Sequence, residues 1–165
     1  MSTALTSHAG TPVLGVEIGV TTVEQLRQDL GKRTSLEKRG INKWSGGEMY
    51  GTDGEAYDIE GLNNVLYIFD TRQKLAGVVL GMGKHKFDSV YKALSAKYKV
   101  AAQQRPFVGD QFARFKPADT VIELNAPHLS FDMEVSYLRN DLMQRFNQQS
   151  EAEKQAKQRS EASKF

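Results

Sequence analysis

Hydrophobic and polar residues alternate most regularly between positions 129 and 137. The apolar members of this pattern are Leu129, Phe131, Met133, Val135 and Tyr137. Successive side chains of a strand point to opposite faces, so the alternation predicts one buried face and one solvent-exposed face. We therefore expect a strand from Leu129 to Tyr137 whose odd-numbered residues all lie in the core.

Two pairs of apolar segments predict hairpins. Val65–Phe69 and Leu75–Met82 are joined by five polar residues, and their continuous apolar character indicates strands that are covered on both faces. Phe112–Lys116 and Thr120–Asn125 flank a short turn that contains proline, which predicts a second hairpin.

Residues 32–63 are more polar and rich in turn-forming residues. We expect only short strand pieces there, at 41–44 and 57–59. The glycine-rich segment Ser45–Glu55 between them is expected to be a loop.

Three segments have helical character. Thr21 and Glu24 form a capping-box pattern, and apolar residues at helical spacing follow until Gly31. A second helix is predicted over 85–99, where one arc of about 100° contains the apolar residues Phe87, Val90, Tyr91, Leu94 and Tyr98. Alanines are the only apolar residues from 147 to 164, which predicts a protruding polar helix or a disordered tail.

This order of elements predicts an α+β protein. We expect two tandem units, each a helix packed on an antiparallel sheet, that share one core. The first unit comprises 13–83 and the second 84–138. Residues 1–12 are expected to be a flexible N-terminus, and 139–165 a C-terminal helix or tail.

Composition and charge exclude several classes of protein. The chain has 165 residues, no cysteine, and 22 basic against 20 acidic residues, and its net charge of +2 arises entirely after position 142. The lack of cysteine excludes disulfides and thiolate metal sites. The longest apolar runs are too short to span a bilayer, so no membrane insertion is expected. A neutral body also attracts nucleic acid poorly.

The segment Gly19–Gly31 resembles the opening of small exported bacterial domains, namely the β-lactamase-inhibitor-protein-like fold and small lipoproteins of outer-membrane assembly. The phrases Leu14–Gly19, Leu94–Lys99 and Ile122–Asn125 are similar to uncharacterised exported proteins of proteobacteria. This resemblance implies a periplasmic or secreted protein with helices on an antiparallel sheet, and it carries no assigned activity. The lack of cysteine departs from the disulfide-bearing inhibitors and the lipid-anchored lipoproteins, so neither specific role transfers.

The N-terminus leaves the compartment open. Residues 1–12 lack the basic start and apolar core of a signal peptide. The chain is therefore expected to be either a cytoplasmic protein or an exported protein whose signal has been replaced by a start methionine.

No motif of a known catalytic class occurs in the chain, and we expect no catalytic residue, no cofactor and no metal ion. Gly81–Lys84 has the composition of a phosphate loop without its spacing, and a strand end is the better interpretation. The histidines His8, His85 and His128 have no metal-ligand spacing. The acidic segment Glu48–Glu60 could bind calcium weakly, but a solvated loop is favoured.

Three classes of function remain. Binding of another protein is favoured, and Trp44, Met49 and Tyr50 beside a glycine hinge are the candidate contact residues, because aromatic anchors dominate interfaces. Trp44 could equally fill the core of the first unit. A small-ligand binder or hydrolase that uses His128 in the groove between the units is the first alternative. Nucleic-acid binding through the lysine-rich helix Lys84–Lys99 is the second, and the inward-facing aromatic residues of that helix argue against it.

Overall fold

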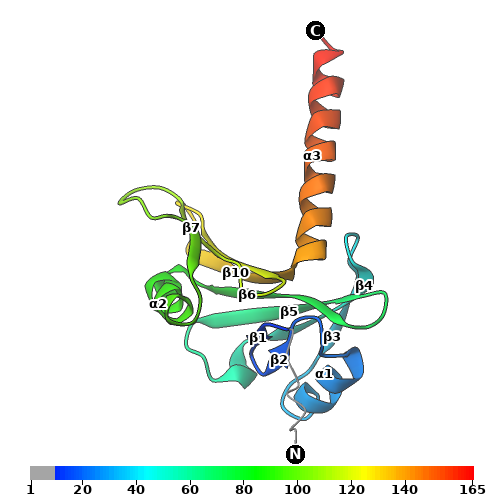
Figure 1. Cartoon of the computed structure of the whole chain (residues 1–165), viewed down its shortest axis with the longest axis vertical. Helices are drawn as coiled ribbons and strands as arrows, with labels where there is room; N and C mark the ends of the chain where they lie inside the picture. Colours follow the sequence, from blue (N-terminus) through cyan, green and yellow to red (C-terminus); the bar gives the residue numbers. More distant parts are fainter. Residues whose placement is uncertain (1–9) are drawn as a thin grey trace, which may run out of the picture.

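A computed structural model of the chain describes residues 10–165 and shows an α+β architecture (Figure 1). Eight antiparallel strands form one sheet in the order β3-β4-β5-β6-β10-β9-β8-β7. The helices α1 and α2 and a small hairpin lie on one face of this sheet, while α3 rises from the other. We call the face that carries only α3 the open face.

The first half of the sheet follows the chain without interruption. The two-residue strands β1 (Pro12–Val13) and β2 (Val16–Glu17) form the small hairpin, and α1 (Val23–Leu30) follows. The meander then consists of β3 (Glu37–Ile41), β4 (Gly46–Asp53), β5 (Leu62–Asp70) and β6 (Leu75–Gly83), with a 3₁₀ turn at Glu55–Tyr57.

The second half repeats this plan. After a 3₁₀ turn at Lys84–Lys86 come α2 (Phe87–Lys97), β7 (Val100–Gln104), β8 (Gln111–Phe115), β9 (Thr120–Ala126) and β10 (Asp132–Arg139). The two four-stranded meanders join where β6 pairs antiparallel with β10. The expectation of tandem helix-on-sheet units with a shared core is confirmed.

The amphipathic helices form as their apolar spacing predicts. α1 buries Val23, Leu26 and Leu30 against the sheet. Its capping box uses Thr22 and Gln25 instead of Thr21 and Glu24, so the predicted pair was wrong by one residue. The hydroxyl of Thr21 instead accepts the backbone N–H of Glu17, which holds the chain entering the helix.

The segment expected to be a loop is a strand. β4 contains most of Ser45–Glu55, and β3 lies earlier than the predicted piece at 41–44. Residues 57–59 form no strand. The glycines that indicated a loop have a packing role instead: a Cβ on Gly47 would lie 2.1 Å from the carbonyl oxygen of Phe69. Glycine is therefore required where the start of β4 passes close to the end of β5.

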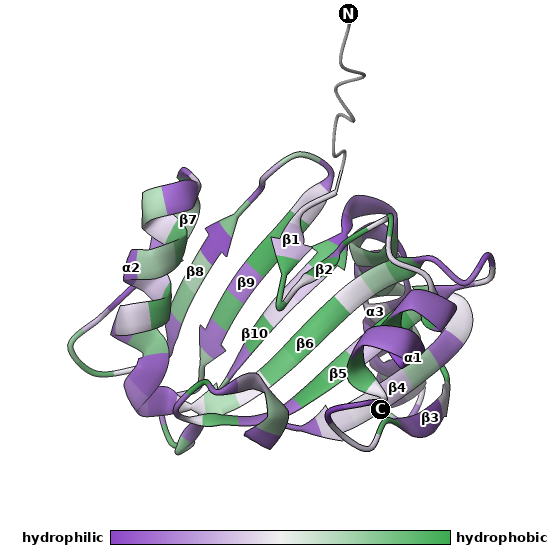
Figure 2. Ribbon diagram, turned by 90° about the horizontal axis from the view of Figure 1, so that it is seen from below, coloured by the Kyte–Doolittle hydropathy of each residue, from purple (hydrophilic) through white to green (hydrophobic). Residues whose placement is uncertain are grey.

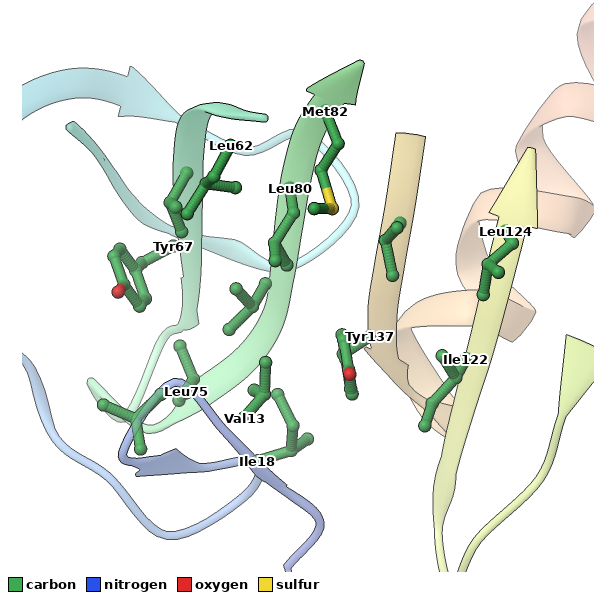
Figure 3. Packing of buried hydrophobic residues seen from close by; sticks show 14 of the residues in the cluster. Val13, Ile18, Leu62, Tyr67, Leu75, Leu80, Met82, Ile122, Leu124 and Tyr137 are labelled. Carbon is green, nitrogen blue, oxygen red and sulfur yellow. The ribbon is translucent and has the colours of Figure 1, made fainter. Parts of the chain in front are cut away.

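The core lies between the sheet and the α1–α2 layer. Figure 2, seen from the covered face, shows apolar residues concentrated on the central strands beneath the helices and the β1–β2 hairpin. The largest fully buried side chains include Tyr67, Phe69 and Phe115. Leu80, Met82 and Tyr137 belong to this same cluster (Figure 3).

The alternating strand begins later than expected. Met133, Val135 and Tyr137 are buried as predicted, but Leu129 and Phe131 are 91% and 93% exposed. Their placement in the core was wrong, because the sheet ends with the pair Asp132 and Gly83, so Leu129 and Phe131 lie beyond the paired strands. An alternating sequence cannot bury side chains where no second layer exists.

The C-terminal segment is helical. α3 (Asn140–Ala162) is anchored by Leu142, which packs on Ile68 and Ala76 of the open face. Every residue from 151 onward is exposed. The segment is therefore the protruding polar helix that its composition allowed.

Candidate functional site: the open face of the sheet

An apolar groove lies on the open face at the foot of α3. It has a volume of about 630 Å³. Leu66, Ile68, Val79 and Leu138 of the central strands line its floor, and Trp44 and Phe146 line its wall. We call it the α3 groove. It exists because α3 leaves the sheet steeply and covers only a small part of this face (Figure 1).

Trp44 is held at the edge of the α3 groove by contacts with α3. Its ring meets the ring of Phe146 edge to face, with centroids 4.9 Å apart. The Nζ of Lys43 lies 4.8 Å from the Trp44 ring centroid, and Arg145 donates to the Trp44 carbonyl at 3.3 Å. The indole Nε1 is buried without a hydrogen-bond partner among residues 10–165. An unpaired buried donor is costly, so the polar end of the Trp44 ring contributes no stability to this corner.

The open face becomes polar toward the second half of the sheet. Glu123 on β9 pairs with Arg114 on β8 at 2.7 Å, and the Arg114 guanidinium lies 4.9 Å from the centroid of the Phe112 ring. Ser136 on β10 lies between Glu123 and Val79 of the apolar floor, and the neighbouring pair of Glu134 and Asn125 also lines the groove. The surface therefore offers apolar area at one side and hydrogen-bonding groups at the other.

Four large apolar side chains are exposed on two connections at one end of the sheet. These loop tips are Phe107 and Val108, between β7 and β8, and Leu129 and Phe131, between β9 and β10. Figure 1 shows the β7–β8 connection rising on the same side of the sheet as α3. The loop tips and α3 thus stand at opposite sides of the open face.

The two connections are tied together by polar contacts. The backbone N–H of His128 donates to Asp110 at 2.7 Å. The ammonium of Lys84 donates to the carbonyls of Pro127 and His128, at 2.7 and 3.1 Å. These bonds fix the backbone that carries the loop tips, although the apolar side chains themselves have almost no packing.

The structure separates the three predicted contact residues. Trp44 and Met49 line the α3 groove. Tyr50, 2% exposed, points to the opposite face, because neighbouring residues of a strand alternate. Its hydroxyl donates to Glu48 and accepts from Arg27, and burial raises its pKa. Tyr50 is therefore a core residue, and its expected exposure was wrong.

The other candidate residues do not converge. His128 is exposed on the β9–β10 connection, and His8 lies outside the described residues. Gly81–Lys84 passes from β6 into a 3₁₀ turn, as its simpler interpretation predicted. Among residues 10–165, no three histidine or acidic side chains are grouped to hold a metal ion.

The acidic segment and the lysine-rich helix also have structural roles. Glu48 pairs with Lys38 at 2.7 Å, whereas Glu55 belongs to the separate 3₁₀ turn. On α2, Phe87 is buried and Tyr91 packs inward against Phe115, as the helical spacing predicted.

A network of three charged residues fixes the start of α3. Arg139 donates to both carboxylate oxygens of Asp141, at 2.6 and 2.9 Å, and to Asp70 at 2.9 Å. The hydrogen bonds from Arg139 lower the pKa of Asp141. Burial alone would raise the pKa of Asp70, but the N–H groups of Lys74 and Arg72 and the Arg139 guanidinium hold it below its ordinary value.

These lowered pKa values predict a loss of stability in acid. A carboxyl group whose pKa is lower in the folded state stabilises the protein above its unfolded pKa of about 4, and this contribution disappears as the pH falls through the folded pKa. We expect Asp141→Asn to reduce the slope of the free energy of unfolding against pH below about pH 4. Urea denaturation at several pH values measures that slope. Asp29→Asn, on the exposed side of α1, is the matched control, and an equal change in both variants would contradict the assignment to the network.

Comparison of the chain with protein-family models, with curated proteins and with solved structures finds no match. Between residues 10 and 165, no helix is both long and apolar enough to cross a membrane.

Proposed function

We propose that this protein acts without catalysis by binding another protein on its open face, between α3 and the loop tips. The observation that supports this most is the exposure of Phe107, Leu129 and Phe131 at one side of a sheet face that has an apolar groove at its other side. Large apolar surface that remains exposed on a folded chain is typical of interaction sites.

The dimensions of the open face favour a protein over a small molecule. Six strand spacings separate β4, at the α3 groove, from β7, at the loop tips. With neighbouring strands about 4.8 Å apart, this corresponds to a width of about 29 Å. Specific protein interfaces bury about 800 Å² on each partner, which a face of this width can provide.

The chemistry of the face also suits a protein partner. Trp44 and the phenylalanines of the loop tips are aromatic residues, which are enriched in protein interfaces, and tryptophan is among the types that contribute most to binding energy. The ion pair of Arg114 and Glu123 is internally balanced, and Glu134 adds a single carboxylate, so the centre of the face carries little net charge. We infer that binding tolerates moderate salt.

An inhibitor or an accessory protein of the bacterial envelope is the role that we propose within this class. The resemblance of Gly19–Gly31 to exported domains of the β-lactamase-inhibitor-protein-like fold supports a periplasmic or secreted location. The location is part of the proposal and is testable with a gene that includes the upstream coding region.

Site-specific cross-linking tests the open face directly. A photoreactive phenylalanine analogue at Glu134, in the middle of the open face, should cross-link a partner from an extract of bacterial envelope proteins. The same analogue at Gln28, exposed on α1 at the covered face, is the matched control. Equal cross-linking from both positions, or from Gln28 alone, would contradict a partner on the open face.

Substitutions at the two sides of the face test its extent. Phe107→Ser at the loop tips and Trp44→Ala at the α3 groove should each abolish capture of the cross-linked partner, with the fold checked by circular dichroism. Phe165→Ser removes an equally exposed phenylalanine at the end of the chain and should leave capture intact. His128→Ala should also leave capture intact. Capture that survives both Phe107→Ser and Trp44→Ala would refute the proposal.

A further inference from the structure

A second apolar cavity lies on the opposite, covered face of the sheet, between α2 and the β1–β2 hairpin. Its volume is about 460 Å³. We call it the α2 cavity. In Figure 2 the β1–β2 hairpin and α2 are separated above the central strands, and the cavity occupies the gap between these two elements.

The gap is present because the side of α2 that faces the hairpin has small side chains. Ser89 and Ala93 are four residues apart, so they lie on the same side of the helix, and both line the cavity. Larger residues at these two positions would close the space. The Ser89 hydroxyl donates a hydrogen bond to the Lys86 carbonyl, so it adds little polarity to the wall of the cavity.

The floor of the α2 cavity is apolar. Leu80 and Met82 of β6 and Val135 and Tyr137 of β10 form it, and all four are less than 10% exposed. Figure 3 shows Leu80, Met82 and Tyr137 on the same side of the two strands. Burial raises the pKa of Tyr137 to about 12, as expected for a phenol in a poorly hydrated site.

The charges around the cavity have one sign. Lys86 and Lys97 line the cavity at the two ends of α2. Neither lysine forms an ion pair within residues 10–165. No carboxylate of the described residues lines the cavity. Lys97 lies eleven positions after Lys86, which corresponds to about 16 Å along a helix axis. An elongated apolar floor with a cation at each end is complementary to an alkyl chain with an anionic head group.

We propose that the α2 cavity binds one single-chain anionic amphiphile, with its alkyl chain along the Leu80–Tyr137 floor and its head group paired with Lys86 or Lys97. The volume lies within the range of about 300–1,000 Å³ that is typical of small-molecule sites. The site lies on the opposite side of the sheet from the proposed protein-binding face and does not depend on that function. Free fatty acids and alkyl phosphates share this chemistry.

Calorimetric titration with amphiphiles of one chain length tests the head-group preference. Dodecanoate and dodecyl phosphate, each kept below its micelle concentration, should bind with one molecule per chain. Dodecyltrimethylammonium, which has the same alkyl chain and a positive head group, should bind at least about tenfold more weakly. The anionic ligand that binds with the higher affinity identifies the preferred head group. Equal affinity for the cationic and anionic compounds would overturn the proposal.

Variants test the location. Ala93→Trp fills the cavity from an exposed position on α2 and should weaken dodecanoate binding by at least about tenfold without lowering the melting temperature. Ser89→Phe tests the same blockage if the tryptophan variant folds poorly. Lys86→Gln or Lys97→Gln should weaken dodecanoate binding, whereas Lys92→Gln, on the opposite side of α2, should not. Unchanged binding in the blocking variants, or equal losses in all three lysine variants, would show that the amphiphile binds elsewhere.

Discussion

Replacing Phe115 with alanine should lower the free energy of unfolding by about 3–5 kcal/mol, because it removes a large side chain from a tightly packed core. Phe115 is fully buried on β8, and its ring lies 6.1 Å from that of Tyr91 on α2. The substitution leaves a cavity between the sheet and the helix of the second half. Urea denaturation of the variant and the wild type measures the difference.

Phe131→Ala is the matched control for this prediction. The Phe131 side chain is 93% exposed, so its removal should change the free energy of unfolding by no more than about 0.5 kcal/mol. A similar loss in both variants would mean that the β9–β10 connection packs against the body.

Leu142→Ala should lower the free energy of unfolding by about 2–3 kcal/mol, because a buried leucine is replaced in a small cluster that can partly relax. Leu142 is 3% exposed and contacts Ile68 and Ala76 on the open face. We also expect a loss of helical signal in circular dichroism. A polar helix without a tertiary anchor is only marginally stable in water, so the far part of α3 depends on this contact.

Shortening α3 from its far end should have a much smaller effect. A chain that ends after Gln149 keeps Leu142 and Phe146 and loses the exposed ion pair of Lys43 and Glu153, whose side chains are both more than half exposed. Such surface pairs contribute little to stability, so the melting temperature should change hardly at all. A drop of many degrees would indicate that the distal part of α3 packs against another chain.

The sequence predicted those elements whose residues bury one regular face. The strands of the β5–β6 hairpin are continuous apolar runs, while α2 and the inner residues of β10 have regular apolar spacing, because each element packs against a second layer. In such elements the local pattern and the tertiary packing require the same residues, so the apolar pattern of the sequence is sufficient to locate the element.

The missed elements are at the edges of the sheet. β3 is exposed at every position, and β7 is mostly exposed, so neither has an apolar period. Backbone pairing with the neighbouring strand, rather than side-chain burial, determines both, and pairing leaves little trace in composition. The glycines of β4 were misleading because they also reflect the approach of one backbone to another. Gly47 is required by the proximity of the Phe69 carbonyl, not by a loop.

The candidate site was only partly predictable. Trp44 and Met49 were identified by residue type and a neighbouring glycine hinge, but the floor of the α3 groove combines Leu66, Val79 and Leu138 from three strands. Leu66 and Val79 already face each other in the β5–β6 hairpin, but only the pairing of β6 with β10 adds Leu138, and a local pattern does not reveal that pairing. The loop tip at Phe107 had a usable signal, since two large apolar residues between Pro106 and Gly109 are unusual in a turn.

The pairing of β6 with β10 also has a consequence for the kinetics of folding. Every other pair in the main sheet joins strands that are consecutive in the chain, whereas Leu80 and Val135, paired at this junction, are 55 residues apart. Local hairpins close quickly, and long-range pairing must first overcome a larger loss of chain entropy. The two meanders should therefore form early and associate late. We therefore expect substitutions confined to the junction to accelerate unfolding much more than they slow folding, as holds for contacts that form after the transition state.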